Sequence, residues 1–324
     1  MADERVLIVG GSGFIGKGIQ KSAMDMGRGD LLTFTYFEHP EAIHDAFKKV
    51  HVNLLEKEGG AALKDYKIAI FVAGQGNQTL AGADPLKDIQ MNVELFLNFM
   101  KYFRGSAVIL SSQAVYQGLQ GEVNEKTIHI PKSPFGISNR AAEAYADYFF
   151  HLGWLRKLWI FRLLYSYGPG EMHRRLLPMC AWAASNKAKI TVHGGGKSYL
   201  NPLRSDFVGK VLLNASDIVA DAEDGSYEVF NLNHPKKTTT LDVVKILAGA
   251  RHFDYTVQSG GEEWPSTYWG ETKRLANLMK QLNLEVPDVK RSLVDYFLDI
   301  QSKPIKKERE APGKKEKKPV VWPV

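Results

Sequence analysis

The sequence predicts an α/β protein in which a doubly wound parallel sheet carries a smaller C-terminal substrate lobe. Short apolar segments recur along the first half of the chain, and segments with helical spacing lie between them. Strands that are buried on both faces and joined by helices are typical of a parallel sheet. A glycine-rich turn follows the first apolar segment, and after residue 171 the alternation becomes less regular.

The expected strands are short apolar runs rich in β-branched residues. In the first part of the chain these runs are residues 6–11, 31–37, 50–55, 68–74, 106–112 and 158–164. Apolar residues at helical spacing predict helices between them, most clearly at residues 88–103 and 139–153. Further along, the pattern predicts strands at 189–196 and 226–232 and helices near 174–185, 205–216, 240–250 and 272–282.

The glycine-rich turn after the first expected strand is a binding motif. Gly10, Gly13 and Gly16 have the spacing G-x-x-G-x-x-G, with Phe14 and Ile15 at the start of the following helix. Glycines allow a tight turn and a close approach of the backbone to a pyrophosphate, and the first N–H groups of a helix attract the anion. The motif therefore predicts a dinucleotide cofactor, NAD or NADP.

The end of the second expected strand does not decide between these two cofactors. An acidic residue there would bind the free 2′-hydroxyl of the adenosine ribose. Thr35 and Tyr36 occupy the strand end, and Glu38 follows Tyr36 two residues later. No arginine follows directly to bind a 2′-phosphate. Tyr36 is counted among the cofactor-binding candidates, and both cofactors stay open.

The elements divide the chain into two lobes and a tail. We expect a dinucleotide-binding domain over residues 1–168, to which residues 206–232 return. The substrate lobe is expected to contain residues 169–205 and 233–302. Residues 303–324 are expected to form a disordered tail, because this segment is rich in Lys, Glu and Pro.

The basic charge is concentrated in the tail. Lys303–Lys318 contains eight basic and three acidic residues (8 − 3 = +5), so the rest of the chain contributes +1 to the formal net charge of +6. A nearly neutral body argues against nucleic-acid binding, whereas the tail offers a contact for a protein partner. No apolar run approaches the roughly 20 residues of a membrane helix, and the first strand leaves no room for a signal peptide. We therefore expect no membrane span and a cytoplasmic location.

Cysteine and histidine content disfavours disulfides and metal chemistry. Cys180 is the single cysteine, so it cannot form an internal disulfide. The nine histidines are scattered, without the spacing of metal ligands. No metal site is predicted.

Several further motifs occur in an order that carries a family resemblance: GGSGFIG, FVAG, MNVELFLNF, LSSQAVY, SPFGISNRAAE, FRLLYSYGPG and VFNL. On these motifs the chain resembles the extended short-chain dehydrogenases/reductases of the NAD-dependent epimerase/dehydratase group, which act on nucleotide sugars. The resemblance covers roughly residues 5–300. It implies a Rossmann fold, an NAD(P) cofactor, a nucleotide-sugar-like ligand and a homodimer formed through the two helices that flank the active site.

The resemblance also implies roles for individual residues. Asn53 sits where the family often has an Asp that touches the adenine, and Ala73 and Gly74 are expected to line the path of the cofactor. Tyr165 lies in the segment that passes the nicotinamide. Ser112 matches the family's catalytic Ser/Thr, which hydrogen-bonds the reacting sugar oxygen.

Two positions depart from the family pattern. The resemblance places Phe135 at the position of the catalytic Tyr and Asn139 at the position of the Lys. In the family the Tyr hydroxyl transfers a proton while a hydride moves to or from the nicotinamide, and the Lys lowers the pKa of that Tyr. A phenyl ring transfers no proton, and loss of a positioned acid or base costs about 10²- to 10⁴-fold in rate. None of the 13 tyrosines is followed four residues later by Lys, so a displaced motif does not explain the departure.

Tyr116 and Lys132 are the best replacement pair near these positions, and with Ser112 they form the candidate catalytic set. A third departure concerns the substrate. Leu200 stands where the family often has an Arg that contacts the nucleotide diphosphate, and Lys197 or Arg204 could compensate.

Three uses of the fold therefore stay open. The chain is either a divergent sugar-nucleotide enzyme with another acid or base, or a non-catalytic member that acts as a cofactor-binding structural or accessory subunit. RNA binding is the least favoured use, because it depends on the tail and on analogy with atypical relatives. The double departure at Phe135 and Asn139 favours a dinucleotide-binding protein that cannot run the Tyr-dependent mechanism.

Overall fold

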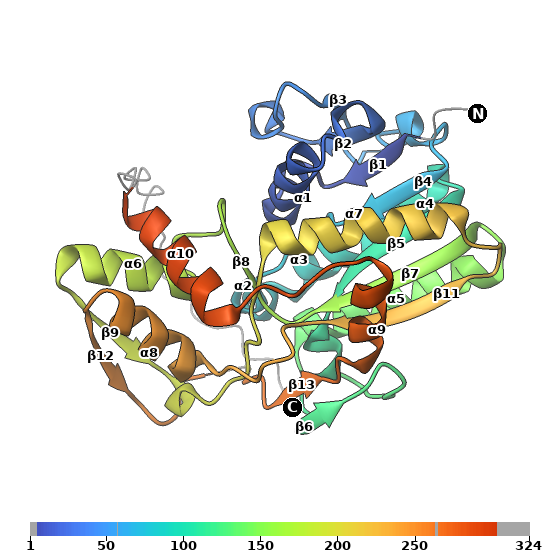
Figure 1. Cartoon of the computed structure of the whole chain (residues 1–324). Coiled ribbons are helices and arrows are strands. Elements are labelled where there is room, and N and C mark those ends of the chain that lie inside the picture. The colour runs from blue at the N-terminus through green and yellow to red at the C-terminus, as the bar shows by residue number, and fades with distance from the viewer. Residues whose placement is uncertain (1–4, 57, 263–264, 303–324) are drawn as a thin grey trace.

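A computed structural model of the protein describes residues 5–56, 58–262 and 265–302. Its centre is a seven-stranded sheet with the strand order β11-β7-β5-β4-β1-β2-β3, and every neighbouring pair is parallel (Figure 1). The strands are β1 (Val6–Val9), β2 (Leu32–Tyr36), β3 (Lys48–His51), β4 (Ile68–Phe71), β5 (Gly105–Ser112), β7 (Leu155–Leu163) and β11 (Tyr227–Leu232). The chain moves outward from β1 to one edge and from β4 to the other, which defines a doubly wound sheet. The predicted fold class is therefore confirmed.

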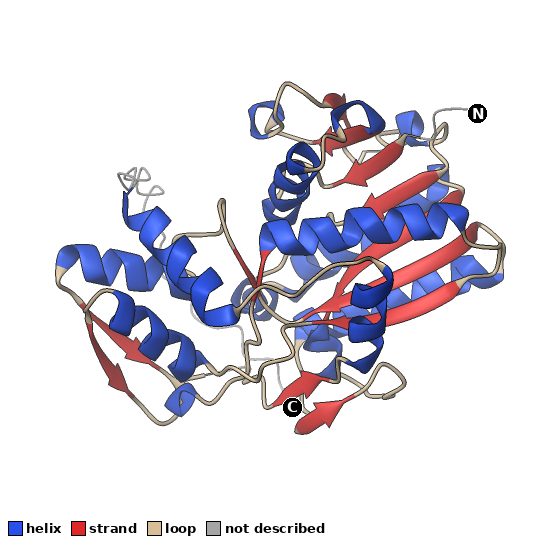
Figure 2. Cartoon of the chain, viewed as in Figure 1, coloured by secondary structure: helices blue, strands red, loops and turns tan. Residues whose placement is uncertain are grey.

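Helices cover both faces of this sheet (Figure 2). Because side chains alternate along a strand, Ile8 and Ile70 belong to the core under one layer and Leu7 and Ala69 to the core under the other. The first layer contains α1 (Phe14–Asp25) and α7 (Ser205–Asp221), and the second contains α4 (Leu95–Tyr102) and α5 (Pro134–His151). Burial on both faces explains why the strands read as continuous apolar runs.

Two glycines allow α1 and α7 to pack closely. A Cβ at Gly18 would lie 2.3 Å from the carbonyl oxygen of Ser205, and a Cβ at Gly209 would lie 2.7 Å from the backbone of Gly18. Both distances are too short for any residue except glycine without a shift of the backbone. This contact fixes α7 beside the helix that begins at the glycine-rich turn.

The C-terminal lobe has its own hydrophobic core, to which Leu177, Val243 and Phe297 contribute fully buried side chains. Its elements are α6 (Leu176–Asn186), β9 (Lys189–Val192), α8 (Thr240–Ala250), β12 (Asp254–Val257) and α10 (Val289–Ser302). Strands β9 and β12 pair in parallel. The remaining elements are β6 (Gly121–Val123), β8 (Ser166–Tyr167), β10 (Leu203–Arg204), β13 (Tyr268–Gly270), α2 (Gln78–Ala83), α3 (Pro85–Ile89) and α9 (Lys273–Gln281).

The chain passes between the lobes more than once. After α6 and β9 in the C-terminal lobe, α7 and β11 return to the central sheet, and the chain then enters the C-terminal lobe again at α8. Figure 1 shows the C-terminal lobe beside the ends to which the strand arrows point. The predicted tail, residues 303–324, lies outside the described residues.

Several expected elements differ from the observed ones at their ends. Helix α5 begins at Pro134 rather than near residue 139, because the Ser133 hydroxyl accepts a 3.1 Å hydrogen bond from the N–H of Gly136 and caps the helix. The expected helix over residues 88–103 is interrupted by a π-helical turn at Gln90–Glu94. Within the described part of the chain, no helix is long and apolar enough to cross a membrane.

Candidate functional site

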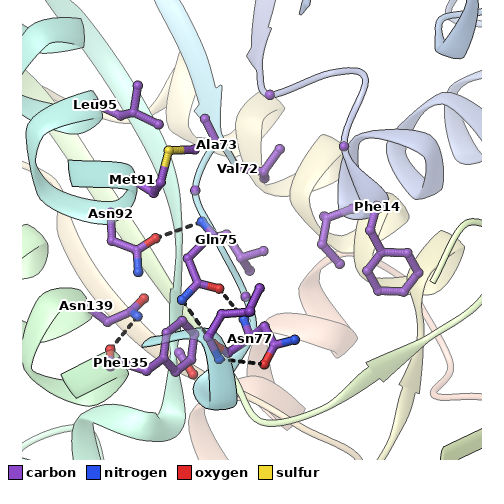
Figure 3. A pocket seen from close by; sticks show the side chains of 18 of the residues that line it. Phe14, Val72, Ala73, Gln75, Asn77, Met91, Asn92, Leu95, Phe135 and Asn139 are labelled. Carbon is purple, nitrogen blue, oxygen red and sulfur yellow. Dashed lines mark hydrogen bonds between the residues drawn. The ribbon is translucent and has the colours of Figure 1, made fainter. Parts of the chain in front are cut away.

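A cleft of about 1110 Å³ lies at the carboxyl ends of the central strands. After β1 the chain continues to one edge of the sheet, and after β4 it continues to the other edge. The loops that follow these two neighbouring strands therefore diverge, and the cleft lies between them. Gly10 after β1, Ala73 after β4 and Arg175 of the C-terminal lobe all line the cleft. Figure 3 shows Ala73 and Phe135 on one side of the cleft and Phe14 on the other.

Glycine is required at two positions of the turn after β1. Gly10 has a φ of +93°, and a Cβ there would lie 2.7 Å from the backbone of Ala73. A Cβ at Gly16 would lie 2.3 Å from the carbonyl oxygen of Gly11. The turn is therefore tight, and it lies against the backbone that follows β4.

The turn leads into the uncapped start of α1. Gly13 is the N-cap residue and offers no side chain, and the first turn of α1 contains no acidic residue. Gly13, Phe14 and Ile15 line the cleft. The positive end of the helix dipole therefore has no negative side chain in its first turn, which suits a bound anion such as a pyrophosphate.

Polar residues surround the end of β2. Tyr36, Glu38 and Asn53 line the cleft, and contact of Tyr36 and Asn53 with a cofactor stays a prediction. The Thr35 hydroxyl accepts a 3.0 Å hydrogen bond from the N–H of Gly10, which joins β2 to the glycine turn. Glu38 is the acidic residue closest in sequence to the end of this strand.

Ser112, Phe135 and Asn139 line the same cleft, although they come from β5 and α5. Phe135 and Asn139 are four residues apart on α5 and therefore lie on one face of the helix. Phe135 is 8% exposed and packs with Ala81 and Ala114. The Asn139 amide donates a 2.7 Å hydrogen bond to the carbonyl of Phe135 (Figure 3), and the Ser112 hydroxyl accepts one of 3.1 Å from the N–H of Ala114.

The Tyr116 and Lys132 pair is not brought into the cleft. Tyr116 is 1% exposed, and its hydroxyl donates to the side-chain oxygen of Asn231 at 3.0 Å and accepts from Arg162 at 2.6 Å. Burial raises the pKa of Tyr116 to about 12. The Lys132 side chain lies against Gly118, and neither Tyr116 nor Lys132 is among the residues that line the cleft.

A polar network behind the cleft wall was not predicted from the sequence. Gln75 lines the cleft, and its side chain donates a 2.7 Å hydrogen bond to the buried carboxylate of Asp88. Asn92 donates to the same carboxylate oxygen at 2.9 Å and to the Ser138 hydroxyl at 3.1 Å. The Asn92 side-chain oxygen accepts from the N–H of Gln75 at 2.9 Å, as Figure 3 shows. This network fixes the loop after β4 against α5.

The sequence contained one signal for this network. Asp88 and Asn92 are polar residues four apart in the expected helix over residues 88–103, which places both on one helix face. Asn92 lies in the π-helical turn, and such turns are frequent at functional sites. The side chain of Gln75 comes from a distant loop, so the sequence alone gives no indication of its contact with Asp88.

Arg175 was also missed. Its guanidinium lies 4.5 Å from the centre of the Tyr165 ring and 5.4 Å from that of Phe14, so it connects the C-terminal lobe to the glycine turn. Its Nε atom is 3.7 Å from the Glu171 carboxylate. Burial raises the pKa of Glu171 to about 7 and the pKa of Tyr165 to about 12. Arg174 and Met172 line the cleft beside Arg175.

Neither Lys197 nor Arg204 replaces, in the cleft, the Arg that the family often has at the position of Leu200. Leu200 packs at the core of the C-terminal lobe, and Arg204 pairs with Asp206 at 3.1 Å. Neither these residues nor Lys197 are among the described residues that line the cleft. Arg174 and Arg175 are instead the cations that the C-terminal lobe contributes.

The sheet order, the glycine turn and the cleft at the strand ends define a protein of the Rossmann type. The chain belongs to the NAD-dependent epimerase/dehydratase family, because the model of that family matches residues 6–202, which is more than half of the chain. Comparison with curated protein sequences gives no match.

Solved structures share the whole fold at low sequence identity. UDP-glucose 4-epimerase from Thermotoga maritima, solved with UDP-glucose, has a TM-score of 0.77 at 18% identity, over 91% of this chain and 99% of that chain. UDP-glucuronic acid 4-epimerase from Bacillus cereus, in complex with UDP-glucuronic acid and NAD, has a TM-score of 0.77 at 15% identity, over 92% and 99%. DesIV, a dTDP-glucose 4,6-dehydratase from Streptomyces venezuelae, has a TM-score of 0.79 at 16% identity, over 92% and 97%. At these identities the likeness establishes the fold.

Proposed function

We propose that the protein binds NAD in the cleft and does not use the Tyr-dependent proton transfer of its family. The observation that carries this proposal is the cleft wall on α5, where Phe135 and Asn139 present an apolar ring and a neutral amide. The intact glycine turn and the uncapped start of α1 support retained cofactor binding. NAD bound to relatives with the same fold, such as the Bacillus cereus epimerase, supports it as well.

The ionisable groups of the cleft support binding without the usual turnover. Oxidation or reduction at a sugar carbon needs a group that moves a proton at the attached oxygen at neutral pH. The described ionisable residues that line the cleft are Tyr36, Glu38, Lys87, Tyr165, Arg174 and Arg175. A pKa of about 12 keeps Tyr165 protonated, and the arginines do not lose their protons. Tyr36 is the last residue of β2 and Glu38 follows two residues later, so both lie at the β2 end of the cleft rather than on its α5 wall. The ammonium of Lys87 donates to Gln90 at 2.8 Å.

Glu38 favours NAD over NADP. A carboxylate at this end of the cleft would accept a hydrogen bond from a free 2′-hydroxyl and would repel a 2′-phosphate. Thr35, Tyr36, Phe37 and Asn53 line the same end and carry no positive charge. We therefore expect NADP to bind at least tenfold more weakly than NAD, and Glu38→Gln to reduce this difference.

The second ligand is proposed to be a small molecule that resembles a nucleotide sugar. Relatives of the same fold bind UDP-glucose and UDP-glucuronic acid, and this cleft extends from the glycine turn to residues of the C-terminal lobe. Arg174 and Arg175 supply positive charge there for an anionic group. The particular sugar is not specified by these residues.

Retention of Ser112 in the cleft favours a second candidate function, a divergent sugar-nucleotide enzyme with another acid or base. In that case Lys87, which also lines the cleft, is the candidate for the other acid or base. Turnover of UDP-sugars by the wild-type protein that is lost in Lys87→Gln and Ser112→Ala would establish this alternative over the first proposal.

Self-association is proposed through α5. Ile137, Tyr145 and Tyr148 of α5 and Leu152 at its C-cap are between 42% and 54% exposed, and they follow one another at near-helical spacing. The sequence-based expectations of a homodimer and of a cytoplasmic location remain predictions, as does a protein contact of the basic tail. Sedimentation of the wild type and of Tyr148→Lys tests the dimer.

The first test of the cofactor is direct. Freshly purified protein is denatured, and the released nucleotide is identified by mass spectrometry, while calorimetry measures NAD and NADP binding to the emptied protein. We expect NAD to be released or bound. If neither nucleotide is released and neither binds, cofactor binding by this chain is rejected.

The second test concerns the missing acid. Phe135→Tyr combined with Asn139→Lys restores the two side chains of the family mechanism in the existing cleft. NAD reduction by UDP-sugars that appears only in the double variant would support the proposal. NAD reduction by the wild type that equals that of the double variant and exceeds the background without protein would contradict it.

A further inference from the structure

A second cavity, of about 240 Å³, lies at the amino ends of the central strands. The cleft described above lies at the opposite, carboxyl ends of these strands. The described residues that line it are Lys67, Arg104, Gly105, Gly153, Trp154 and Arg156. Three of these six are cations and none is acidic. Lys67 directly precedes β4, Arg104 directly precedes β5, and Arg156 is the second residue of β7.

The sheet topology brings these cations together. Strands β4, β5 and β7 are adjacent in the sheet, so their first residues lie next to one another although they are distant in sequence. A Cβ at Gly105 would lie 2.2 Å from the carbonyl oxygen of Lys67, so only glycine allows the strands to approach here. The N–H of Gly105 bonds to the carbonyl of Trp154 at 3.2 Å, and that of Ser106 to the carbonyl of Lys67 at 2.8 Å.

Arg104 is held in a fixed orientation at this cavity. Its guanidinium lies 3.4 Å from the centre of the Trp154 ring, and the ring of Phe149 stacks on Trp154 at 5.0 Å with an angle of 17°. One terminal nitrogen of the guanidinium donates to the carbonyls of Met100 and Phe103 at the end of α4. The other N–H groups make no hydrogen bond to the described residues, and no carboxylate lies within ion-pair distance of Arg104 in the described part of the chain.

The other two cations are only weakly neutralised. Lys67 is exposed and forms no ion pair with a described residue, and Arg156 approaches Asp224 at 4.0 Å with both side chains more than half exposed. Unpaired cations around a cavity repel one another, and an anion between them removes this repulsion. An arginine that is already oriented loses little entropy when it binds an oxyanion.

We propose that this cavity binds a small phosphate-like dianion, either inorganic phosphate or the phosphate group of a monoester. The Trp154 ring already contacts the Arg104 guanidinium at 3.4 Å and stacks with the ring of Phe149 at 5.0 Å, so these contacts compete with the stacking of an aromatic base. The cavity volume of about 240 Å³ also suits a small ligand. Lys67 and Arg156 contribute charge, whereas Arg104 contributes directed N–H groups.

The test uses the full chain with saturating NAD, so that phosphate does not bind at the glycine turn, and in the Arg174→Gln/Arg175→Gln background, so that it does not bind to the arginines of the cleft. Titration with inorganic phosphate and with glucose 1-phosphate is followed by calorimetry and by indole fluorescence, and Trp154→Phe identifies the signal of Trp154. We expect saturable binding of at least one of these anions that weakens as sodium chloride is raised, with little response to chloride alone. Binding of glucose 1-phosphate alone would assign the ligand to a monoester.

The variants separate binding from stability. Arg104→Gln and Lys67→Gln are each expected to weaken binding about tenfold, which is the effect of losing one charge-assisted hydrogen bond. Lys101→Gln on the last turn of α4 is the control, because it removes the same charge from an exposed residue that does not line the cavity. If Arg104→Gln unfolds, Lys67→Gln decides, since Lys67 makes no side-chain hydrogen bond to a described residue.

Two results would overturn the proposal. The first is no saturable binding of either anion by the wild type at low salt. The second is binding that Lys67→Gln and Lys101→Gln weaken equally, which would indicate attraction by net charge alone. NAD binds at a different site, so neither result bears on the proposed cofactor function. If NAD does not bind, the same anion titration is carried out on the unliganded protein, with Trp154→Phe as the reference.

Discussion

At the scale of single residues, Tyr116 is held in the interior of the protein and does not line the cleft. Its ring is fully enclosed, and its hydroxyl joins Arg162 to Asn231. Arg162 is in turn held by two hydrogen bonds of 2.8 and 2.9 Å from its guanidinium to Glu143. The hydroxyl therefore serves a buried polar network that connects β7, α5 and β11.

Tyr116→Phe is predicted to lower stability without affecting cofactor binding. Removal of the hydroxyl leaves a buried Arg162 N–H and the Asn231 oxygen with one partner fewer, at a cost of about 1–3 kcal/mol in the free energy of unfolding. Chemical denaturation measures the stability and calorimetry the NAD affinity. Tyr255→Phe in β12 is the control and should change stability by less than about 0.5 kcal/mol, because the Tyr255 hydroxyl forms no hydrogen bond to a described residue. A large loss of NAD affinity in Tyr116→Phe would contradict this placement.

Glu171 is predicted to make stability depend on pH. Burial raises the pKa of Glu171 from its usual 4.5 to about 7, so the folded state holds this proton more tightly than the unfolded state does. The contribution is present at low pH and is lost as the pH rises from about 4.5 through about 7. Over this range the free energy of unfolding of the wild type should fall by up to about 3 kcal/mol relative to Glu171→Gln.

The measurement for Glu171 is a pair of denaturation series from pH 4.5 to pH 8. Other titrating groups are common to both proteins and cancel in the difference between them. A difference that stays constant with pH would show that Glu171 keeps an ordinary pKa in the folded protein.

At the scale of secondary-structure elements, the contact between α1 and α7 is sensitive to a single added methyl group. Gly18→Ala is predicted to destabilise the protein by more than about 2 kcal/mol, because its Cβ would lie 2.3 Å from the backbone oxygen of Ser205. Gly249→Ala in α8 is the matched control, since nothing lies within 4 Å of a Cβ there. That control should gain about 0.5–1 kcal/mol from helix propensity. Thermal or chemical denaturation of both variants checks the opposite signs.

The elements that could be predicted are those whose signal is local. Continuous apolar runs predict β1, β4 and β5. The glycine spacing predicts the turn that precedes α1, because the backbone of Ala73 lies too close to residue 10 for any residue except glycine. Strand β3 was predicted at residues 50–55 but lies at Lys48–His51. It is an edge strand with partly exposed side chains, so its apolar pattern is weak.

Residues of the cleft could be predicted where their own strand or helix places them there. They could not be predicted where contacts between distant parts of the chain place them. Ser112, Phe135 and Asn139 were expected at the site and line the cleft. Tyr116 and Lys132 were chosen as a pair because they lie near Phe135 and Asn139 in the sequence. Proximity in sequence does not indicate in which direction a side chain points. Arg175 was missed because its place beside Phe14 depends on how the C-terminal lobe sits against the sheet.

At the scale of the whole molecule, both lobes contribute to the cofactor cleft, so a bound cofactor should stabilise the protein as one unit. With free NAD at about 100 times its dissociation constant, the free energy of unfolding should rise by about 2.7 kcal/mol. Thermal denaturation with and without NAD, with NADP as the comparison, measures this. An unchanged midpoint with NAD would contradict the proposed function, and equal shifts with both nucleotides would contradict the role given to Glu38.

The return of α7 and β11 to the central sheet has a consequence for synthesis of the chain. When the ribosome has released only the first 168 residues, α1 lacks the helix that packs on Gly18, and β7 lacks its outer neighbour. The apolar face of the half-built sheet is then open to water until residue 232 has emerged. The nascent protein should therefore engage chaperones during that interval, and no contiguous fragment that stops before residue 205 should fold as an independent nucleotide-binding unit.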